Sequence, residues 1–326
     1  MPDAIGGYFE LELRQGCSLY PQALAFNSAR SALKALLGNI GTRRLHLPHY
    51  VCHAVPDAAH AVGVDVARYA IDLQLELEHL PTLQPGELLL YVNYFGLKDR
   101  YISDVLAPHY RERLVVDNSQ GLFSTPLPGI KTLYSPRKFV GVPDGGWLAN
   151  APPGDWQLPQ SQSMTHFAAL LGRLEGAPEQ HYAAFQKVET ELDRAPAAAM
   201  SNSTRRLLDS LDYRSISARR MANLGVLGKL LGARNLLHIL PDTPTAALCY
   251  PLLLGTPEQA QAIRQRLLAE RIFIPCYWQE VIGEPRSPNV ERHLASCLLP
   301  LPIDQRYDAT HMERLADRVS TFLATT

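Results

Sequence analysis

A short segment, LYSPRKFVGVPDGGW, carries the residue type that most clearly suggests chemistry. Lys138 ends a Ser-x-x-Lys turn that begins at Ser135, and a Gly-Gly pair follows at Gly145 and Gly146. A lysine can act as a Schiff-base nucleophile when its amine is deprotonated part of the time, which a partly desolvated site near other cations can arrange. A lone lysine is more often a solvated surface charge, so the rest of the chain has to decide between these interpretations.

An acidic residue precedes this lysine at the end of an apolar run. In RLVVDNSQG, Asp117 ends the run, and Gln120 follows three residues later. A carboxylate at the end of a strand could pair with a protonated ring nitrogen. A turn-forming aspartate that binds local backbone amides is the more ordinary interpretation of Asp117 alone.

A third segment, FNSARSAL, places small polar residues in front of a helix-like stretch. Asn27 and Ser28 come at an expected strand end, and the helix is expected to begin near Ala29. Free amides and a hydroxyl at a helix N-terminus suit a phosphate group. Serine and asparagine are also ordinary N-caps, so this segment by itself leaves both interpretations open.

Short apolar runs alternate with helix-like stretches from about residue 24, which predicts βα units around a mostly parallel sheet. The run 87–96 is almost entirely apolar and therefore predicts a central strand buried on both faces. We expect strands at 43–48, 64–72, 87–96, 113–118, 131–135 and 145–150, and helices at 28–41, 55–63 and 100–112.

A loop rich in proline, glutamine and serine at 151–163 interrupts this alternation, and three helices are expected after it, at 166–176, 179–192 and 217–232. The C-terminal part then predicts strands at 246–255, 272–278 and 297–303, with helices at 258–270 and 311–323. These elements predict a large domain over residues 1–235 and a small α/β domain over residues 236–326. Residues 1–23 could pack on the small domain.

The composition argues against several classes of partner. Lysine and arginine number 31 against 32 aspartate and glutamate, so no charge excess favours nucleic acid or an anionic membrane. No stretch approaches the roughly 20 apolar residues of a membrane span, and the N-terminus lacks a signal-peptide layout, so we expect a cytoplasmic protein. The five cysteines are scattered and form no CxxC motif, which argues against a disulfide framework and a zinc ribbon.

Two other groups of residues have more than one interpretation. His46, His49, Cys52 and His53 have a spacing that could suggest a metal site, but strand alternation and a proline would direct their side chains apart. We therefore expect no metal. The pair Tyr277–Trp278 could line a substrate pocket near the domain boundary, or it could pack between the domains.

Taken in order, these motifs resemble those of the DegT/StrS family of sugar aminotransferases, which are fold-type-I enzymes that use pyridoxal 5′-phosphate (PLP). The matching segments are NSARSAL, LPHYVCH, DNSQ, SPRK and PDGG, and the similarity extends over nearly the whole chain. The resemblance implies an α/β fold like that of aspartate aminotransferase. It has a large domain with a mostly parallel sheet flanked by helices, and a smaller C-terminal α/β domain.

The resemblance also implies roles for individual residues. Lys138 would carry PLP as a Schiff base and transfer the proton, Asp117 would keep the pyridine nitrogen protonated, and Gln120 would face the ring hydroxyl. The phosphate would be held by Ser28, the amide of Ala29, Ser135 and Arg137. The candidates for covering the ring are Tyr50 and His53. Many relatives place an aromatic residue where this chain has Cys52.

The activity implied by the resemblance is transamination from an amino acid, usually glutamate, to a keto sugar carried on a nucleotide. Two rivals are a PLP-dependent lyase, or another fold-type-I enzyme acting on a small amino acid, and a catalytically idle homologue that serves as a scaffold. The resemblance further implies small-molecule substrates and a homodimer with active sites at the subunit interface. Asn202 is a candidate for a residue that one subunit contributes to the other's site.

Overall fold

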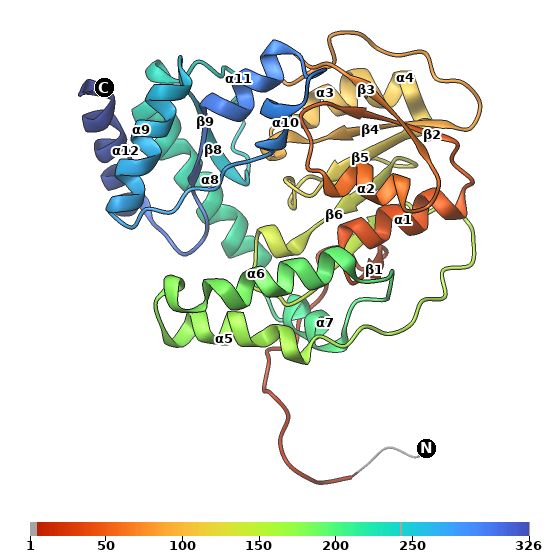
Figure 1. The fold of residues 1–326 in the computed structure, drawn as a ribbon. Coiled ribbons are helices and arrows are strands. Elements are labelled where there is room, and N and C mark those ends of the chain that lie inside the picture. Colours follow the sequence, from red (N-terminus) through yellow and green to blue (C-terminus); the bar gives the residue numbers. More distant parts are fainter. Residues whose placement is uncertain (1–4, 242, 326) are drawn as a thin grey trace.

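A computed structural model describes residues 5–241 and 243–325 and contains a large and a small sheet (Figure 1). The large sheet has seven strands in the order β1-β7-β6-β5-β4-β2-β3. Neighbours from β3 through β6 run parallel, while β7 is antiparallel to both β6 and β1, which confirms the expected mostly parallel sheet. The strands are β1 (Leu24–Phe26), β2 (Arg44–Pro48), β3 (Asp65–Tyr69), β4 (Glu87–Val92), β5 (Leu114–Asn118), β6 (Lys131–Tyr134) and β7 (Gly146–Ala149).

The centre of this sheet is buried along its whole length. Every residue of β4, β5, β6 and β7 is buried, which agrees with the apolar runs of β4 and β5. In β6 the buried residues include Lys131 and Thr132. Helices α1 (Ala29–Asn39) and α2 (Ala54–His60) pack against each other beside the sheet. The buried side chains of α1 lie on one face of the helix, as its apolar spacing predicts.

The helix expected over residues 100–112 is interrupted. It consists of α3 (Asp99–Tyr101), a π-helical turn (Ile102–Leu106) and α4 (Ala107–Tyr110). Pro108 lies in the first turn of α4, where its ring would clash with the carbonyl group four residues earlier in a regular helix. The wider π turn before it relieves this clash.

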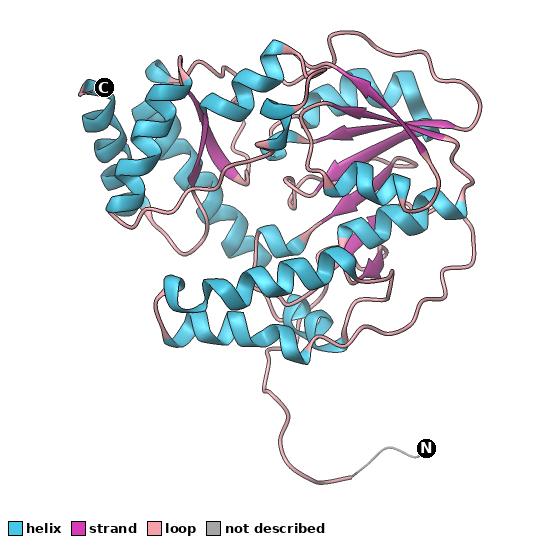
Figure 2. Cartoon of the chain, viewed as in Figure 1, coloured by secondary structure: helices cyan, strands magenta, loops and turns pink. Residues whose placement is uncertain are grey.

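The small sheet pairs β8 (Cys249–Leu253) with β9 (Leu298–Pro302), which are antiparallel (Figure 2). Its helices are α9 (Pro257–Ala269), α10 (Glu280–Gly283), α11 (Asn289–Cys297) and α12 (Ala309–Ala324), and α8 (Tyr213–Leu231) packs against α12. The strand predicted at 272–278 is wrong, because this segment is irregular. Arg271 and Trp278 at its two ends have φ values of +59° and +51°, and Pro275 in its middle has no N–H for a ladder.

Helices α5 (Phe167–Glu175) and α6 (Pro178–Arg194) form a hairpin, followed by α7 (Asn202–Asp209). The first of the described residues extend away from the body of the molecule, past α7 (Figure 1). Glu10 forms an ion pair with Arg206 of α7, and the Tyr20 ring stacks on Tyr134 of β6 at 4.1 Å. These contacts join the N-terminal segment to the large sheet and α7. Packing on the small domain, which the sequence allows for residues 1–23, is not among them. Residues 1–4 lie outside the described residues.

None of the helices in the described ranges has the length and hydropathy that a membrane-spanning segment requires.

Candidate active site

The chemistry-bearing motifs meet at one edge of the large sheet. Asp117 lies near the carboxyl end of β5 and is paired with Leu133 of the parallel strand β6, whose end leads into the turn with Lys138. Ser28 follows β1 and forms a bridge with Gly145, just before β7. The carboxyl edge of the strands is where open α/β sheets bind their ligands. The structure therefore brings three of the predicted motifs to the expected place.

Ser28 is the N-cap of α1. Its hydroxyl oxygen accepts a hydrogen bond of 3.0 Å from the Ser31 amide and donates one of 3.0 Å to the Ser31 hydroxyl. The remaining first-turn amides of a helix have no partner inside the helix, and the helix dipole favours an anion there. The capping role is thus confirmed, and the same end of α1 has the donors that a phosphate needs.

The Gly145–Gly146 pair allows this helix end to lie close to the sheet. Gly145 has a φ of +126°, which side chains rarely adopt, and its amide donates to the Asn27 carbonyl at 2.8 Å. A Cβ atom on Gly146 would lie 2.3 Å from the Ala29 amide nitrogen. Asp144, just before the pair, is fully buried, and its carboxylate accepts hydrogen bonds from the Ser201 amide and hydroxyl.

Asp117 and Gln120 are both buried. The Asp117 carboxylate accepts a hydrogen bond of 2.8 Å from the Ser119 amide, which is the ordinary turn contact considered for it. The Gln120 side-chain oxygen accepts one of 2.9 Å from the Phe95 amide. The Gln120 side-chain nitrogen has no hydrogen-bond partner among the described residues. A buried amide without a partner is costly, so this nitrogen is available to an acceptor on a bound group.

Lys138 ends a 3-10 turn formed by Pro136–Lys138. Its side chain is exposed, and within the described residues no hydrogen bond or ion pair involves its amine. Arg137 beside it is paired with Glu189 of α6, so the guanidinium expected to supplement the phosphate site already has a carboxylate partner. Ser135 is half-buried at the start of the turn.

The two residues expected to cover the ring are used elsewhere. Tyr50 is fully buried, with its ring stacked on Tyr94 at 5.8 Å and edge-on to Trp278 at 4.4 Å. His53 is exposed and lies 3.4 Å from the carboxylate of Glu280. Tyr277 and Trp278 are in contact with this aromatic cluster, which favours packing over a role in lining a pocket.

Cys52, in the loop after β2, is one residue on which the charge of Lys138 acts. Burial raises the pKa of the Cys52 thiol above its ordinary value, and the positive charge of Lys138 partly opposes that rise.

Sequence reasoning missed Asn93 and Arg220. The buried Asn93 amide donates to Asp99 at 2.7 Å and to Asn118 at 2.9 Å, which ties the ends of β4 and β5 together. The sequence contains an indication of this role, because Asn93 is the first polar residue after the apolar end of β4. Arg220 gave no such signal, since its stretch has the charged pattern of an exposed helix face.

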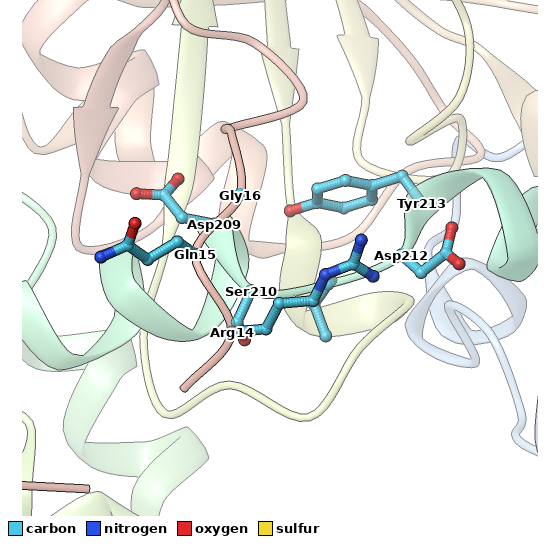
Figure 3. Close-up of a pocket in the computed structure, with 8 residues that line it drawn as sticks. Arg14, Gln15, Gly16, Asp209, Ser210, Asp212 and Tyr213 are labelled. Carbon is cyan, nitrogen blue, oxygen red and sulfur yellow. The ribbon is translucent and has the colours of Figure 1, made fainter. Parts of the chain in front are cut away.

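Two cavities have linings that include none of the candidate site residues. One, of about 190 Å³, is lined by residues 14–16 and 209–213, with the Tyr213 ring on one side (Figure 3). The other, of about 610 Å³, is lined by residues 19–24 and 149–154 near the opposite edge of the sheet. Within residues 5–241 and 243–325, no group of three His, Cys, Asp or Glu side chains is arranged to hold a metal ion.

Comparisons by sequence find no matching family model and no matching curated protein. Solved structures do match. PseC of Helicobacter pylori, an aminotransferase involved in pseudoaminic acid biosynthesis, superposes with a TM-score of 0.63 at 14% identity, over 93% of this chain and 87% of that chain.

Two further structures give similar results. NtdA of Bacillus subtilis, solved with bound cofactor PMP, has a TM-score of 0.66 at 14% identity, covering 93% of this chain and 73% of that chain. A DegT/DnrJ/EryC1/StrS aminotransferase of Brucella abortus has a TM-score of 0.58 at 14% identity, covering 92% and 85%. At such identities the likeness establishes the fold. The chain therefore has the fold of the DegT/DnrJ/EryC1/StrS aminotransferases.

Proposed function

We propose that this chain is a PLP-dependent aminotransferase that moves an amino group from an amino acid, with glutamate as donor, to a keto sugar carried on a nucleotide. The observation that supports this most directly is the placement of Lys138 in the turn after β6, one parallel strand away from Asp117. We further expect a cytoplasmic homodimer that acts in the biosynthesis of amino sugars for surface polysaccharides or secondary metabolites.

The residues at the site fit this cofactor. The buried Gln120 nitrogen lacks a partner among the described residues, as a donor to the ring hydroxyl would before the ring binds. Asp117 is a buried carboxylate, which can pair with a protonated ring nitrogen. The N-terminus of α1, with Ser28 and the Ala29 amide, has donors for the phosphate, and the approach of Gly146 leaves no room for a side chain beside it.

Each side chain of the site would then have a defined role. When bound, PLP supplies an electron sink that stabilises negative charge on the substrate carbon. Lys138 would hold the cofactor through its amine and would move a proton to and from the substrate carbon. Asp117 keeps the ring nitrogen protonated, and Gln120 orients the ring through its hydroxyl. Ser28, the Ala29 amide and Ser135 hold the phosphate, and Arg137 contributes if Glu189 releases it.

The sugar acceptor is supported by the fold shared with PseC, which matches 93% of this chain. The acceptor rests on this likeness, whereas the cofactor rests on the residues of the site, so the two need separate tests. It is tested by offering keto sugars with and without a nucleotide to the enzyme after glutamate treatment.

The experiment for the cofactor is a visible absorbance spectrum of purified protein with PLP, before and after glutamate. Wild type is compared with Lys138→Ala and with Lys229→Ala, which removes an exposed lysine on α8. We expect a band that wild type and Lys229→Ala share, that Lys138→Ala lacks, and that glutamate bleaches. A spectrum in which the three proteins are alike would overturn the enzyme assignment and favour the scaffold alternative.

A further inference from the structure

Arg220 is a buried arginine on α8, with only 2% of its surface exposed. Its guanidinium donates hydrogen bonds to the side-chain oxygen of Gln305 at 3.0 Å and to the carbonyls of Phe139, Ala247 and Leu248 at 3.2 Å each. Across the described residues, no carboxylate lies within ion-pair distance of it. Burial lowers the pKa of Arg220 to about 10, so the group stays charged at neutral pH.

On one side, the hydrogen bonds of Arg220 hold the turn that carries Lys138. Phe139 is the residue that follows Lys138. Its carbonyl accepts hydrogen bonds from both Arg220 and Gln305, the latter at 2.8 Å. The guanidinium also lies over the Phe139 ring, 4.6 Å from its centroid. The backbone and side chain of the residue after the lysine are thus both fixed by Arg220.

On the other side, the hydrogen bonds of Arg220 continue through Leu248 and Phe95 to Gln120. Arg220 binds the Leu248 carbonyl, and the Leu248 amide donates to the Phe95 carbonyl at 2.9 Å. The Phe95 amide in turn donates to the Gln120 side chain at 2.9 Å. Hydrogen bonds therefore connect the turn after Lys138, through Arg220 and the chain segment 247–248, with the amide expected to face the ring.

We propose that Arg220 is a positioning residue that sets the Lys138 turn relative to Gln120, together with its partner Gln305. The role of this geometry in cofactor attachment rests on the proposed function. Arginine suits the position because its planar group carries five donors in a fixed arrangement, whereas a lysine ammonium carries three on a flexible stem. A displacement of about 1 Å in a reacting group can lower a rate on the order of 100-fold.

The test compares wild type with Arg220→Lys, Arg220→Met and Gln305→Leu. Arg219→Met is the matched control, because Arg219 is the neighbouring residue on α8 and is exposed. The first measurement is the rate at which added PLP becomes borohydride-trappable on Lys138, and the second is the visible circular dichroism of the bound cofactor. The third measurement uses protein without PLP. An amine-reactive reagent labels Lys138, and the labelling rate is determined from the masses of the peptides.

We expect attachment about 10- to 100-fold slower in Arg220→Lys and Gln305→Leu, with altered visible circular dichroism, a changed labelling rate of Lys138, and wild-type behaviour of Arg219→Met. Arg220→Met removes the donor of Gln305, Ala247 and Leu248 and one of the two donors of Phe139, and it could fail to fold, so the other two variants carry the test. If they only lower the melting temperature while attachment, dichroism and labelling match wild type, Arg220 is a structural contact and the proposal is overturned.

The two proposals can fail separately. If wild type never attaches PLP to Lys138, the proposed function fails. The labelling rates in protein without PLP then still decide whether Arg220 and Gln305 set the position of the lysine, and unchanged rates would overturn that inference.

Discussion

The Gln120 side-chain oxygen binds the Phe95 amide at 2.9 Å, while its nitrogen is buried without a partner among the described residues. Phe95 has a φ of +58°, which is unusual for a residue with a side chain. One side chain thus stabilises an uncommon backbone conformation with its acceptor and keeps its donor available for a ligand.

The substitution Gln120→Met removes both functions. We expect the free energy of unfolding without PLP to fall by about 1–3 kcal/mol, because the buried Phe95 amide loses its acceptor. The affinity for PLP should fall by roughly three- to tenfold, as for the loss of a neutral hydrogen bond. Urea unfolding and PLP titration measure the two effects, and Gln261→Met on the exposed face of α9 is the control. Unchanged PLP affinity would place the cofactor ring away from Gln120.

The substitution Asp117→Asn tests the ring-nitrogen role. Asparagine keeps an oxygen for the Ser119 amide, so the turn after β5 should persist and unfolding should change little. The carboxylate charge that would face the protonated ring nitrogen is lost. A hydrogen bond to a charged group is worth about 1.5–3 kcal/mol, so we expect the affinity for PLP to fall roughly 10- to 100-fold. The measurement is a PLP titration followed by absorbance. Equal affinities in both proteins would leave Asp117 with the turn contact as its only role.

The substitution Gly146→Ala tests the close approach of α1 to the sheet. Its new methyl group would lie 2.3 Å from the Ala29 nitrogen, so the helix end must move. We expect a loss of about 1–3 kcal/mol in the free energy of unfolding, as for overpacking, and weaker binding of PLP. Gly225→Ala on α8 is the control, since no described residue outside the backbone of α8 itself lies within 4 Å of its new Cβ. Alanine should stabilise this helix by about 0.5–1 kcal/mol. A Gly146→Ala protein as stable as wild type would show that this packing is loose.

The fully buried Glu291 on α11 predicts a pH dependence of stability. Burial raises the pKa of its carboxyl group, and the hydrogen bond of 2.9 Å from the Ile71 amide opposes that rise only in part. The unfolded chain gives up this proton at lower pH than the folded protein does. The contribution to stability is therefore full below the ordinary glutamate pKa and is lost as the pH rises through the raised value.

The substitution Glu291→Gln removes this titration while keeping an oxygen for the Ile71 amide. We expect the variant to gain stability relative to wild type as the pH rises from about 4.5, by about 1.4 kcal/mol for each unit of the pKa difference. Urea unfolding of both proteins between pH 4.5 and pH 8 gives the comparison. A constant difference between them over this range would contradict a raised pKa for Glu291.

Much of the fold follows from local patterns in the sequence. The apolar runs predict β4 and β5 as buried central strands, and Ser28 in front of a helical spacing predicts the start of α1. The motifs with Asp117 and Lys138 fall at the ends of neighbouring parallel strands, so the order of strands brings them to one edge. The strands and the helix start depend on residues close together in the chain, whereas the pairing of β5 with β6 is a contact between separate segments.

The tertiary structure decided which of the remaining candidates are available. Tyr50 is packed among Tyr94 and Trp278, and Arg137 is paired with Glu189, neither of which the local sequence indicates. The predicted strand at 272–278 is rich in apolar residues, but among the described residues it pairs with neither strand of the small sheet.

The sequence by itself determined the order of the elements and the residue types at the sheet edge, because apolar periodicity and capping act within a few residues. The tertiary structure alone decided the surroundings of those residues. Arg220 shows the reason, since its acceptors Phe139 and Gln305 lie 81 and 85 residues away along the chain. An arginine in a pattern typical of an exposed helix face becomes a buried donor only when such distant segments fold around it.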